Sequence, residues 1–309
     1  MSKVPAQPLV SVIISFLNEE RFLTEAIESV LYQHYGHWEL ILVDDGSTDN
    51  STEMAKEYAG RFKDQIFYKD HPGHANKGLS ASRNFGLSFA KGELFAVLDA
   101  DDVWLPEKLS VQCGIMKSFP EIAMICEASL YWNSWSDDGQ KDEVILVGTG
   151  QDMVYYPPEL LKVLYPLSEA AAPCPSGLMI RADKFRKHGG FEEHFRGKYQ
   201  LYEDQAFLHK MYLNEPVYIS SCCNNKYRQR IGSLVQKISQ EGNYHVVRQY
   251  FLEWLEQYMK QNGIAQKNLN DLVSKALKPY RYPNTFKIIN FLTRVKKGLH
   301  RRLTGNQLC

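Results

Sequence analysis

The feature that most constrains the fold is a regular alternation of apolar runs and amphipathic runs over the first hundred residues. Val10–Phe16 is an unbroken apolar run, which is typical of a strand buried on both faces of a sheet. Residues 19–33 then place apolar side chains at helical spacing. The same alternation continues with strand-like runs at 38–45, 65–69 and 94–99 and helix-like runs at 49–62 and 79–90. This rhythm predicts an α/β fold with a mostly parallel, Rossmann-like sheet flanked by helices.

The rhythm changes after about residue 120. Residues 121–135 and 142–148 indicate two strands joined by a turn. Further patterns indicate a short helix at 157–165, a strand entering a helix at 176–185, and helices at 202–213, 242–261 and 265–277. We therefore expect one sheet-based domain over residues 1–240 and a helical C-terminal extension over 241–309.

The formal net charge of zero hides an asymmetry between the body of the chain and its end. No acid follows Asp271, whereas nine Lys and Arg do, so residues 1–271 carry 27 basic minus 36 acidic groups, or −9. Within 285–302 the apolar residues Phe286, Ile289, Leu292, Val295 and Leu299 recur three or four positions apart. This pattern predicts a basic amphipathic helix. Such a helix either lies on an anionic membrane surface or packs on the domain.

Cellular location follows from what the chain lacks. No apolar run approaches the roughly 20 residues that span a bilayer, and the first apolar run resembles a strand more than a signal peptide. The six Cys form no metal-ligand spacing and are typical of reduced thiols. We expect a cytoplasmic protein, peripheral on the inner face of the membrane if the basic tail binds there, with no nucleic-acid partner.

Two acid clusters follow strands of the expected sheet. Asp44 and Asp45 end one strand, and Asp99, Asp101 and Asp102 end another. Ligands bind at this carboxyl edge in open α/β sheets. Crowded carboxylates there suit Mg²⁺ or Mn²⁺ shared with substrate phosphates. The alternative is that these acids cap the turns and helices that follow them.

The second cluster also fits another class of enzyme. "VLDADDV" matches the pattern of aspartyl-phosphate phosphohydrolases, in which the first Asp is a nucleophile. In those enzymes the motif follows the first strand, whereas here it follows about the fourth. The sequence therefore favours this alternative less.

Taken together, the motifs resemble a known family. "PLVSVIISFLNEE", "ILVDDGSTDNST" and "ASRNFGLSFAKGELFAVLDADDVWLPEKL" occur in the order found in glycosyltransferase family 2, which has the GT-A fold. The resemblance spans about 8–235, with a donor-binding half at about 8–120 and an acceptor-side half at about 121–240. It implies inverting transfer of a sugar from a nucleotide-diphosphate sugar, with Mn²⁺ or Mg²⁺. The implied acceptor is a hydroxyl of a glycan or lipid-linked glycan in cell-surface polysaccharide synthesis.

The resemblance also implies roles in donor binding. Ser15 and Leu17 match positions beside the nucleotide base, although an aromatic residue is common where Leu17 stands. Asp45 matches the acid that bonds the base, while Asp44 is expected to be structural. Lys77 is expected either to reach a donor phosphate or to be an ordinary exposed lysine of its loop. In "YRQRIGSL", Arg228 is the best match for the donor phosphates, ahead of Arg230 and Ser233.

The metal and the chemistry are expected at two further motifs. Asp99 and Asp101 match the family's D-x-D, with Asp99 also near the ribose and Asp101 as the direct metal ligand. Asp204 in "YEDQAF" matches the catalytic base, with Glu203 orienting it; without the upstream motifs, both acids would merely favour a helix N-terminus. Arg83 and Asn84 are expected to form a structural salt bridge and a cap. No detailed role is assigned to 173–177, where the family's acceptor wall begins.

A second class of function remains open at this point. A non-catalytic nucleotide-sugar-binding module could keep the same fold, and loss of the D-x-D or of the base would indicate it. Neither motif is lost here, so the sequence favours an active transferase.

Overall fold

The structure is a computed structural model that describes residues 7–136 and 139–284. The chain divides into two compact units, Met1–Tyr244 and His245–Cys309, which are described separately. The basic segment 285–302 lies outside the described residues. Within the described part, no helix is both long enough and apolar enough to cross a bilayer.

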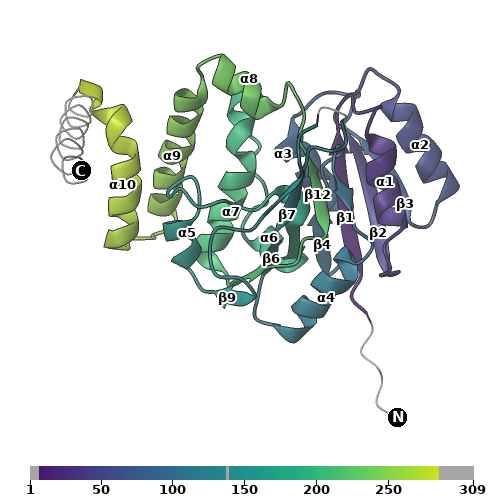
Figure 1. The fold of residues 1–309 in the computed structure, drawn as a ribbon, viewed down its shortest axis with the longest axis horizontal. Coiled ribbons are helices and arrows are strands. Elements are labelled where there is room, and N and C mark those ends of the chain that lie inside the picture. The colour runs from purple at the N-terminus through teal and green to yellow at the C-terminus, as the bar shows by residue number, and fades with distance from the viewer. Residues whose placement is uncertain (1–6, 137–138, 285–309) are drawn as a thin grey trace, which may run out of the picture. The chain divides into compact units, whose positions relative to one another are not determined.

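The first unit is built on an eight-stranded sheet with the strand order β3-β2-β1-β4-β10-β6-β11-β9 (Figure 1). The first four strands in that order are parallel, and β10 and β9 are antiparallel to their neighbours. This is the mostly parallel sheet that the alternation predicted. Its strands are β1 (Val10–Phe16), β2 (Trp38–Asp44), β3 (Ile66–Asp70), β4 (Leu94–Val97), β6 (Met124–Glu127), β9 (Met153–Tyr155), β10 (Leu178–Arg181) and β11 (Val217–Ser220).

Helices cover both faces of the parallel half. The helices of the unit are α1 (Leu23–Leu31), α2 (Ser51–Arg61), α3 (Leu79–Phe89), α4 (Lys108–Ser118), α5 (Glu159–Val163), α6 (Ala182–Lys187), α7 (Glu203–Asn214) and α8 (Leu234–Gln240). Val12 and Ile14 join the core cluster that includes the buried face of α1. Ile13 instead faces α3, where a Cβ on Gly86 would lie 3.0 Å from its side chain. Because Gly86 has no side chain, α3 lies directly against β1 and brings Arg83 to the end of the sheet.

The stretch 121–135 differs from the single strand that its apolar run predicted. It is interrupted at Ala128, so that β6 belongs to the large sheet and β7 (Ser129–Trp132) to a second sheet of four strands. The interruption has a polar cause, because the Asn225 side-chain amide donates to the Ala128 carbonyl at 2.9 Å. The second sheet has the order β5-β12-β7-β8 and contains β5 (Val103–Trp104), β12 (Asn225–Arg228) and β8 (Glu143–Ile145). β7 and β8 pair antiparallel, as the sequence predicted.

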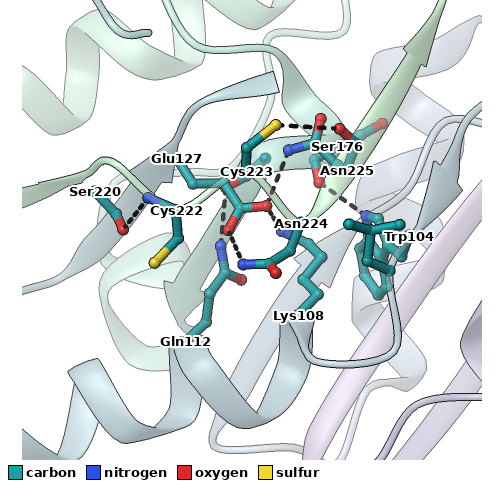
Figure 2. Close-up of polar contacts among 12 residues, drawn as sticks. Trp104, Lys108, Gln112, Glu127, Ser176, Ser220, Cys222, Cys223, Asn224 and Asn225 are labelled. Atoms are coloured by element: carbon teal, nitrogen blue, oxygen red, sulfur yellow. Dashed lines mark hydrogen bonds and ion pairs between the residues drawn. The ribbon is translucent and has the colours of Figure 1, made fainter. Parts of the chain in front are cut away.

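A fully buried ion pair lies where the two sheets meet (Figure 2). Lys108 Nζ lies 3.0 Å from Glu127 Oε1, and both side chains have no exposed surface. Asn225 Nδ2 donates to the same Glu127 oxygen at 2.9 Å. A buried pair is tolerated when further hydrogen bonds satisfy its charges, as they do here. The cluster joins α4, β6 and β12, and so holds the strand that leads to Arg228.

The second unit contains α9 (Tyr244–Gln261) and α10 (Lys267–Arg281). The sequence predicted that the last helix would end near residue 277, before Pro279. This boundary was wrong, because α10 continues through Pro279. Proline removes one helical hydrogen bond, but Arg281 in the last turn pairs with Glu256 of α9 through both of its terminal nitrogens.

Candidate active site

A cavity of about 840 Å³ opens at the carboxyl ends of β1, β2 and β4. It gathers most of the site residues predicted from the sequence, although they come from five separate segments. Lys77 is the exception, because its side chain is exposed and does not line the cavity. The predicted residues in the lining are Ser15, Leu17, Asp45, Asp99, Asp101, Glu203, Asp204 and Arg228.

The two acids of "DD" have different surroundings. Asp44 is fully buried, and it accepts hydrogen bonds from the Ser47 amide at 2.8 Å and from the Thr52 hydroxyl. It therefore stabilises the turn between β2 and α2. Asp45 lines the cavity and accepts from the Lys77 and Gly78 amides at 2.7 and 3.0 Å. The contribution of Lys77 to the site is thus its backbone N–H.

Ser15 and Leu17 lie beside Asp45 in the lining, at the end of β1. The Ser15 hydroxyl is buried and has no hydrogen-bond partner among the described residues. A buried polar group without a partner is uncommon in a folded protein and calls for an explanation such as a bound ligand. Leu17 is 39% exposed, so its apolar side chain is accessible at the cavity wall.

Arg83 joins "DADD" and "YEDQAF" through two ion pairs. Its guanidinium is 1% exposed, with one terminal nitrogen 2.5 Å from Asp99 Oδ1 and the other paired with Glu203 Oε1. Burial raises the pKa of Glu203 to about 7, while the Arg83 charge opposes that rise. Arg83 is therefore the salt-bridging residue that the sequence predicted, and it connects two motifs more than 100 positions apart in the sequence. Asn84, next to it, bonds the backbone of Phe191.

Asp101 faces a cationic side chain. Arg230 Nε lies 2.7 Å from Asp101 Oδ2, and the other two nitrogens of Arg230 bond both oxygens of Glu19 at 2.9 and 3.0 Å. Burial raises the pKa of Asp101 to about 6; Arg230 lowers it, and Asp99 adds to the rise. Asp101 therefore has both a counter-charge, Arg230, and a repelling neighbour, Asp99.

Arg228 was expected to be the better match for a donor-phosphate contact, but its surroundings differ from those of Arg230. Its guanidinium carbon lies 4.3 Å from the Trp132 ring centroid and 4.6 Å from that of Phe22. Its side chain also bonds the Asp101 carbonyl at 2.6 Å and pairs with Glu25. These contacts hold Arg228 in place, whereas Arg230 is one-third exposed beside the carboxylates. Both arginines were expected from the sequence, with Arg228 ranked first as a contact to the donor phosphates. That ranking could not take into account the aromatic rings around Arg228.

Asp204 lies in the first turn of α7, is half-buried and lines the cavity. Its partners are local, because Oδ1 accepts from the Gln205 amide at 2.6 Å and Oδ2 from the Gln205 side chain at 3.2 Å. Burial raises the pKa of Asp204 to about 6. At neutral pH the group is ionised, and its pKa lies near the value that suits a general base.

Four tyrosines that the sequence analysis did not single out also line the cavity. Tyr165 and Tyr244 place their hydroxyls 2.9 Å apart, and Tyr131 and Tyr227 place their rings 5.2 Å apart. Tyr227 begins "YRQRIGSL", but no quoted motif contains the other three, which come from distant segments. Aromatic walls with a few polar groups are typical of small-molecule sites.

No three His, Cys, Asp or Glu side chains are grouped as a complete metal site within residues 7–136 and 139–284. Asp99 and Asp101 each have one oxygen bonded to an arginine. The other oxygen of each carboxylate, Asp99 Oδ2 and Asp101 Oδ1, is not part of these two ion pairs.

Comparison with known proteins gives a family match that covers more than half of the chain. The model of "Glycosyl transferase family 2" matches residues 11–189. Among curated proteins, the putative glycosyltransferase EpsE of Bacillus subtilis is 39% identical over 134 residues, which are 43% of this chain and 48% of EpsE. The chain thus spans about half the length of this relative.

Two further proteins are informative. The UDP-Glc:alpha-D-GlcNAc-diphosphoundecaprenol beta-1,3-glucosyltransferase WfgD of Escherichia coli is 37% identical over 109 residues, 35% of this chain and 41% of WfgD. The solved structure of S. aureus TarS 1–349 in complex with UDP has a TM-score of 0.61 at 17% identity, covering 89% of this chain and 73% of that one. The TarS likeness shows a shared fold.

Proposed function

Since this chain belongs to glycosyltransferase family 2, we propose that it moves a sugar from a nucleotide-diphosphate sugar to a hydroxyl acceptor with inversion at the anomeric carbon. The observation that carries this proposal is the meeting of three motifs in one cavity. Asp45, the pair Asp99 and Asp101, and Asp204 all line it. They supply, respectively, a nucleotide contact, a site for the diphosphate and its cation, and a base.

Donor binding is proposed at the end of β1. The unpaired Ser15 hydroxyl and the Asp45 carboxylate offer a donor and an acceptor to a nucleotide base. Leu17 offers an apolar contact where an aromatic ring would stack more strongly. The UDP bound in TarS, a protein of the same fold, supports a nucleotide as the ligand.

A divalent cation, Mn²⁺ or Mg²⁺, is proposed at Asp99 and Asp101. The fit rests on the donor set, because the arginine pairs use only Asp99 Oδ1 and Asp101 Oδ2 and leave the second oxygen of each carboxylate for a cation. Mg²⁺ is commonly held by one or two carboxylates, with substrate phosphates completing its shell. When bound, the cation would stabilise the charge on the leaving diphosphate. Arg230 is proposed to pair with the diphosphate as well.

Asp204 is proposed as the general base. Inversion requires a base that takes the acceptor's proton while its oxygen attacks opposite the leaving group. Glu203 is occupied by Arg83 and by the Ser80 hydroxyl at 3.4 Å. The Asp204 oxygens bond only Gln205 among the described residues, so they have lone pairs for the acceptor hydroxyl.

The acceptor is proposed to be a glycan or lipid-linked glycan in polysaccharide synthesis. The tyrosines of the lining, with Glu169 and Lys237, supply flat apolar faces and hydrogen-bonding groups suited to a sugar. WfgD, whose name gives a diphosphoundecaprenol-linked sugar as acceptor, supports the lipid-linked form.

The two alternative functions are less well supported. A phosphohydrolase would need Asp99 as its nucleophile, but Arg83 holds an oxygen of that group at 2.5 Å. A non-catalytic module would have lost the base or the D-x-D, and both motifs line the cavity.

A donor screen tests the proposal. UDP-, GDP- and dTDP-sugars are added with and without Mn²⁺, and thermal stabilisation and donor hydrolysis are measured. One nucleotide class should stabilise the protein and be hydrolysed only with the cation. Failure of every class to do either would contradict a nucleotide-sugar donor.

The transfer rate is expected to fall on the acid side of about pH 6. The pKa of Asp204 is raised to about 6, and only the ionised form accepts a proton. Below that pH, kcat should fall by about tenfold per unit, and above it kcat should level off. The measurement is kcat between pH 5 and 8 at saturating donor and Mn²⁺. Thermal melts at each pH are the control, and a rate that stays constant down to pH 5 would contradict the assignment.

Membrane attachment is proposed for the basic segment 285–302, on sequence grounds alone. Each Lys or Arg near an anionic surface adds about 1 kcal/mol. The full-length protein should float with anionic liposomes and detach as salt rises. A chain truncated after Asn284, which keeps the Arg281–Glu256 pair of α10, should stay in solution. Equal flotation of both forms, or of neither, would contradict the proposal.

A further inference from the structure

A short turn beneath the cavity contacts the acid cluster directly. Pro175–Gly177 forms one 3₁₀ turn, and Ser176 within it is fully buried. The Ser176 hydroxyl donates to Asp102 Oδ2 at 2.6 Å and accepts from the Asp99 amide at 3.2 Å. One hydroxyl therefore touches both the first and the last residue of "DADD".

The acid cluster is itself a tight turn. The Asp102 amide donates to the Asp99 carbonyl at 3.0 Å, which leaves Asp101 between the two ends. Asp102 does not line the cavity; its other oxygen accepts from the Arg228 amide at 2.9 Å. The carboxyl group of Asp102 therefore stabilises this turn, as the capping alternative for the acid clusters predicted.

Ser176 is held in place from the opposite side. Its carbonyl accepts from the Trp104 indole at 2.8 Å, as Figure 2 shows. The next carbonyl, of Gly177, accepts from the Gln112 side chain at 3.0 Å. A Cβ on Gly177 would lie 3.2 Å from the Glu127 carbonyl, so the turn packs closely on the buried Lys108–Glu127 cluster. The position of the hydroxyl is therefore fixed by the core.

We propose that Ser176 is a positioning residue that sets the orientation of Asp99 and Asp101 toward the cation. The inference rests on the proposed cation site and extends it to a residue outside that site. Asp99 and Asp101 line the cavity, whereas Ser176 contacts neither carboxylate and acts through the backbone of Asp99 and the side chain of Asp102.

The physical reason lies in the repulsion within the turn. Three carboxyl groups occupy four consecutive residues, and the side chain of Asp102 is buried. Without the Ser176 hydroxyl, Asp102 keeps its hydrogen bond from the Arg228 amide but loses the one from Ser176. The Asp99 amide loses its acceptor. The turn can then relax, and the two cavity carboxylates lose their mutual placement.

The test measures the affinity of the Ser176→Ala variant for Mn²⁺, with electron paramagnetic resonance as the readout. Mn²⁺ is titrated alone and with UDP, GDP or dTDP, whichever stabilises the parent most. Loss of an outer partner of a metal ligand typically costs 10- to 100-fold in affinity, so we expect Mn²⁺ to bind at least about tenfold more weakly. At saturating Mn²⁺, kcat should recover toward that of the parent, because the base is untouched.

Ser29→Ala is the matched control. Ser29 is also buried, but its hydroxyl bonds only the Ala26 carbonyl within α1, away from the cavity. It should keep parental Mn²⁺ affinity even if its melting temperature falls. Ser176→Cys, which keeps a weak donor of similar size, should give an intermediate affinity. Asp102→Asn combined with Ser176→Ala should weaken Mn²⁺ binding by less than the product of the single effects, because both act on one bond.

The outcomes distinguish failure of the positioning role of Ser176 from failure of the cation site itself. Parental Mn²⁺ affinity in a folded Ser176→Ala would overturn the positioning role while leaving the cation site in place. A parent that binds no Mn²⁺ with any nucleotide would overturn the cation site, and the positioning role with it. If Ser176→Ala does not fold, the Ser176→Cys affinity decides: a parental value would overturn the role, and a weakened one would support it.

Discussion

Asp204→Asn is expected to lower the transfer rate by at least about a hundredfold, the lower end of typical general-base contributions. The amide is nearly isosteric with the carboxylate but cannot accept the acceptor's proton. Donor affinity should be unchanged, because Asp204 is assigned to the acceptor and not to the nucleotide. The effect should therefore appear in kcat and leave donor binding, measured by calorimetry, at the parental value.

The matched control is Asp183→Asn. Asp183 also lies in the first turn of a helix, α6, but it is exposed and does not line the cavity. This variant tests whether the loss of any helix-terminal carboxylate is enough to slow the enzyme. A near-parental rate in Asp204→Asn would remove Asp204 from the mechanism and make Glu203 the next residue to test.

Asp101→Ala is expected to abolish Mn²⁺-dependent donor binding while the protein stays folded. The substitution removes the carboxylate assigned as the direct ligand, and it leaves Arg230 paired with Glu19. Because burial and neighbouring acids raise the pKa of Asp101, its charged form is strained in the metal-free protein. The melting temperature without metal should therefore be equal to that of the parent or higher.

Calorimetric titration of donor with and without Mn²⁺ checks this second prediction. Asp64→Ala, which removes an exposed acid outside the cavity, is the control and should bind like the parent. If Asp101→Ala retains the Mn²⁺-dependent part of donor affinity, the cation is held elsewhere. In that case the pairing of Asp101 with Arg230 would be structural only.

Local pattern determined much of the parallel half of the fold. The apolar run 10–16 and the amphipathic run after it became β1 and α1, and the strand at 38–45 became β2. Such elements can be predicted because period and burial are encoded in neighbouring residues. Both acid clusters could be placed at the sheet edge for the same reason, since each follows a strand of that sheet. The family resemblance added their order and pointed to Asp204.

The strands outside the parallel half of the large sheet were harder to predict from the sequence. The run 121–135 reads as one strand, yet Asn225, about a hundred residues later, bonds its backbone where β6 gives way to β7. β11 and β12 were not predicted. Each is only four residues long and pairs with strands far away in sequence. Short strands carry little periodicity, and their pairing is decided by distant residues.

Local pattern and motif order were enough to predict the fold class, to place the two acid clusters and to indicate the family. The hydrogen-bond and ion-pair partners of each charged side chain depend on the tertiary structure. It enclosed Arg228 between aromatic rings and left Arg230 beside Asp101. The Lys77 side chain is exposed, and the Ser176 hydroxyl bonds Asp102 of "DADD". The physical reason is that a strand or helix repeats within a few residues, whereas the partner of a buried polar group is chosen by packing across the whole domain.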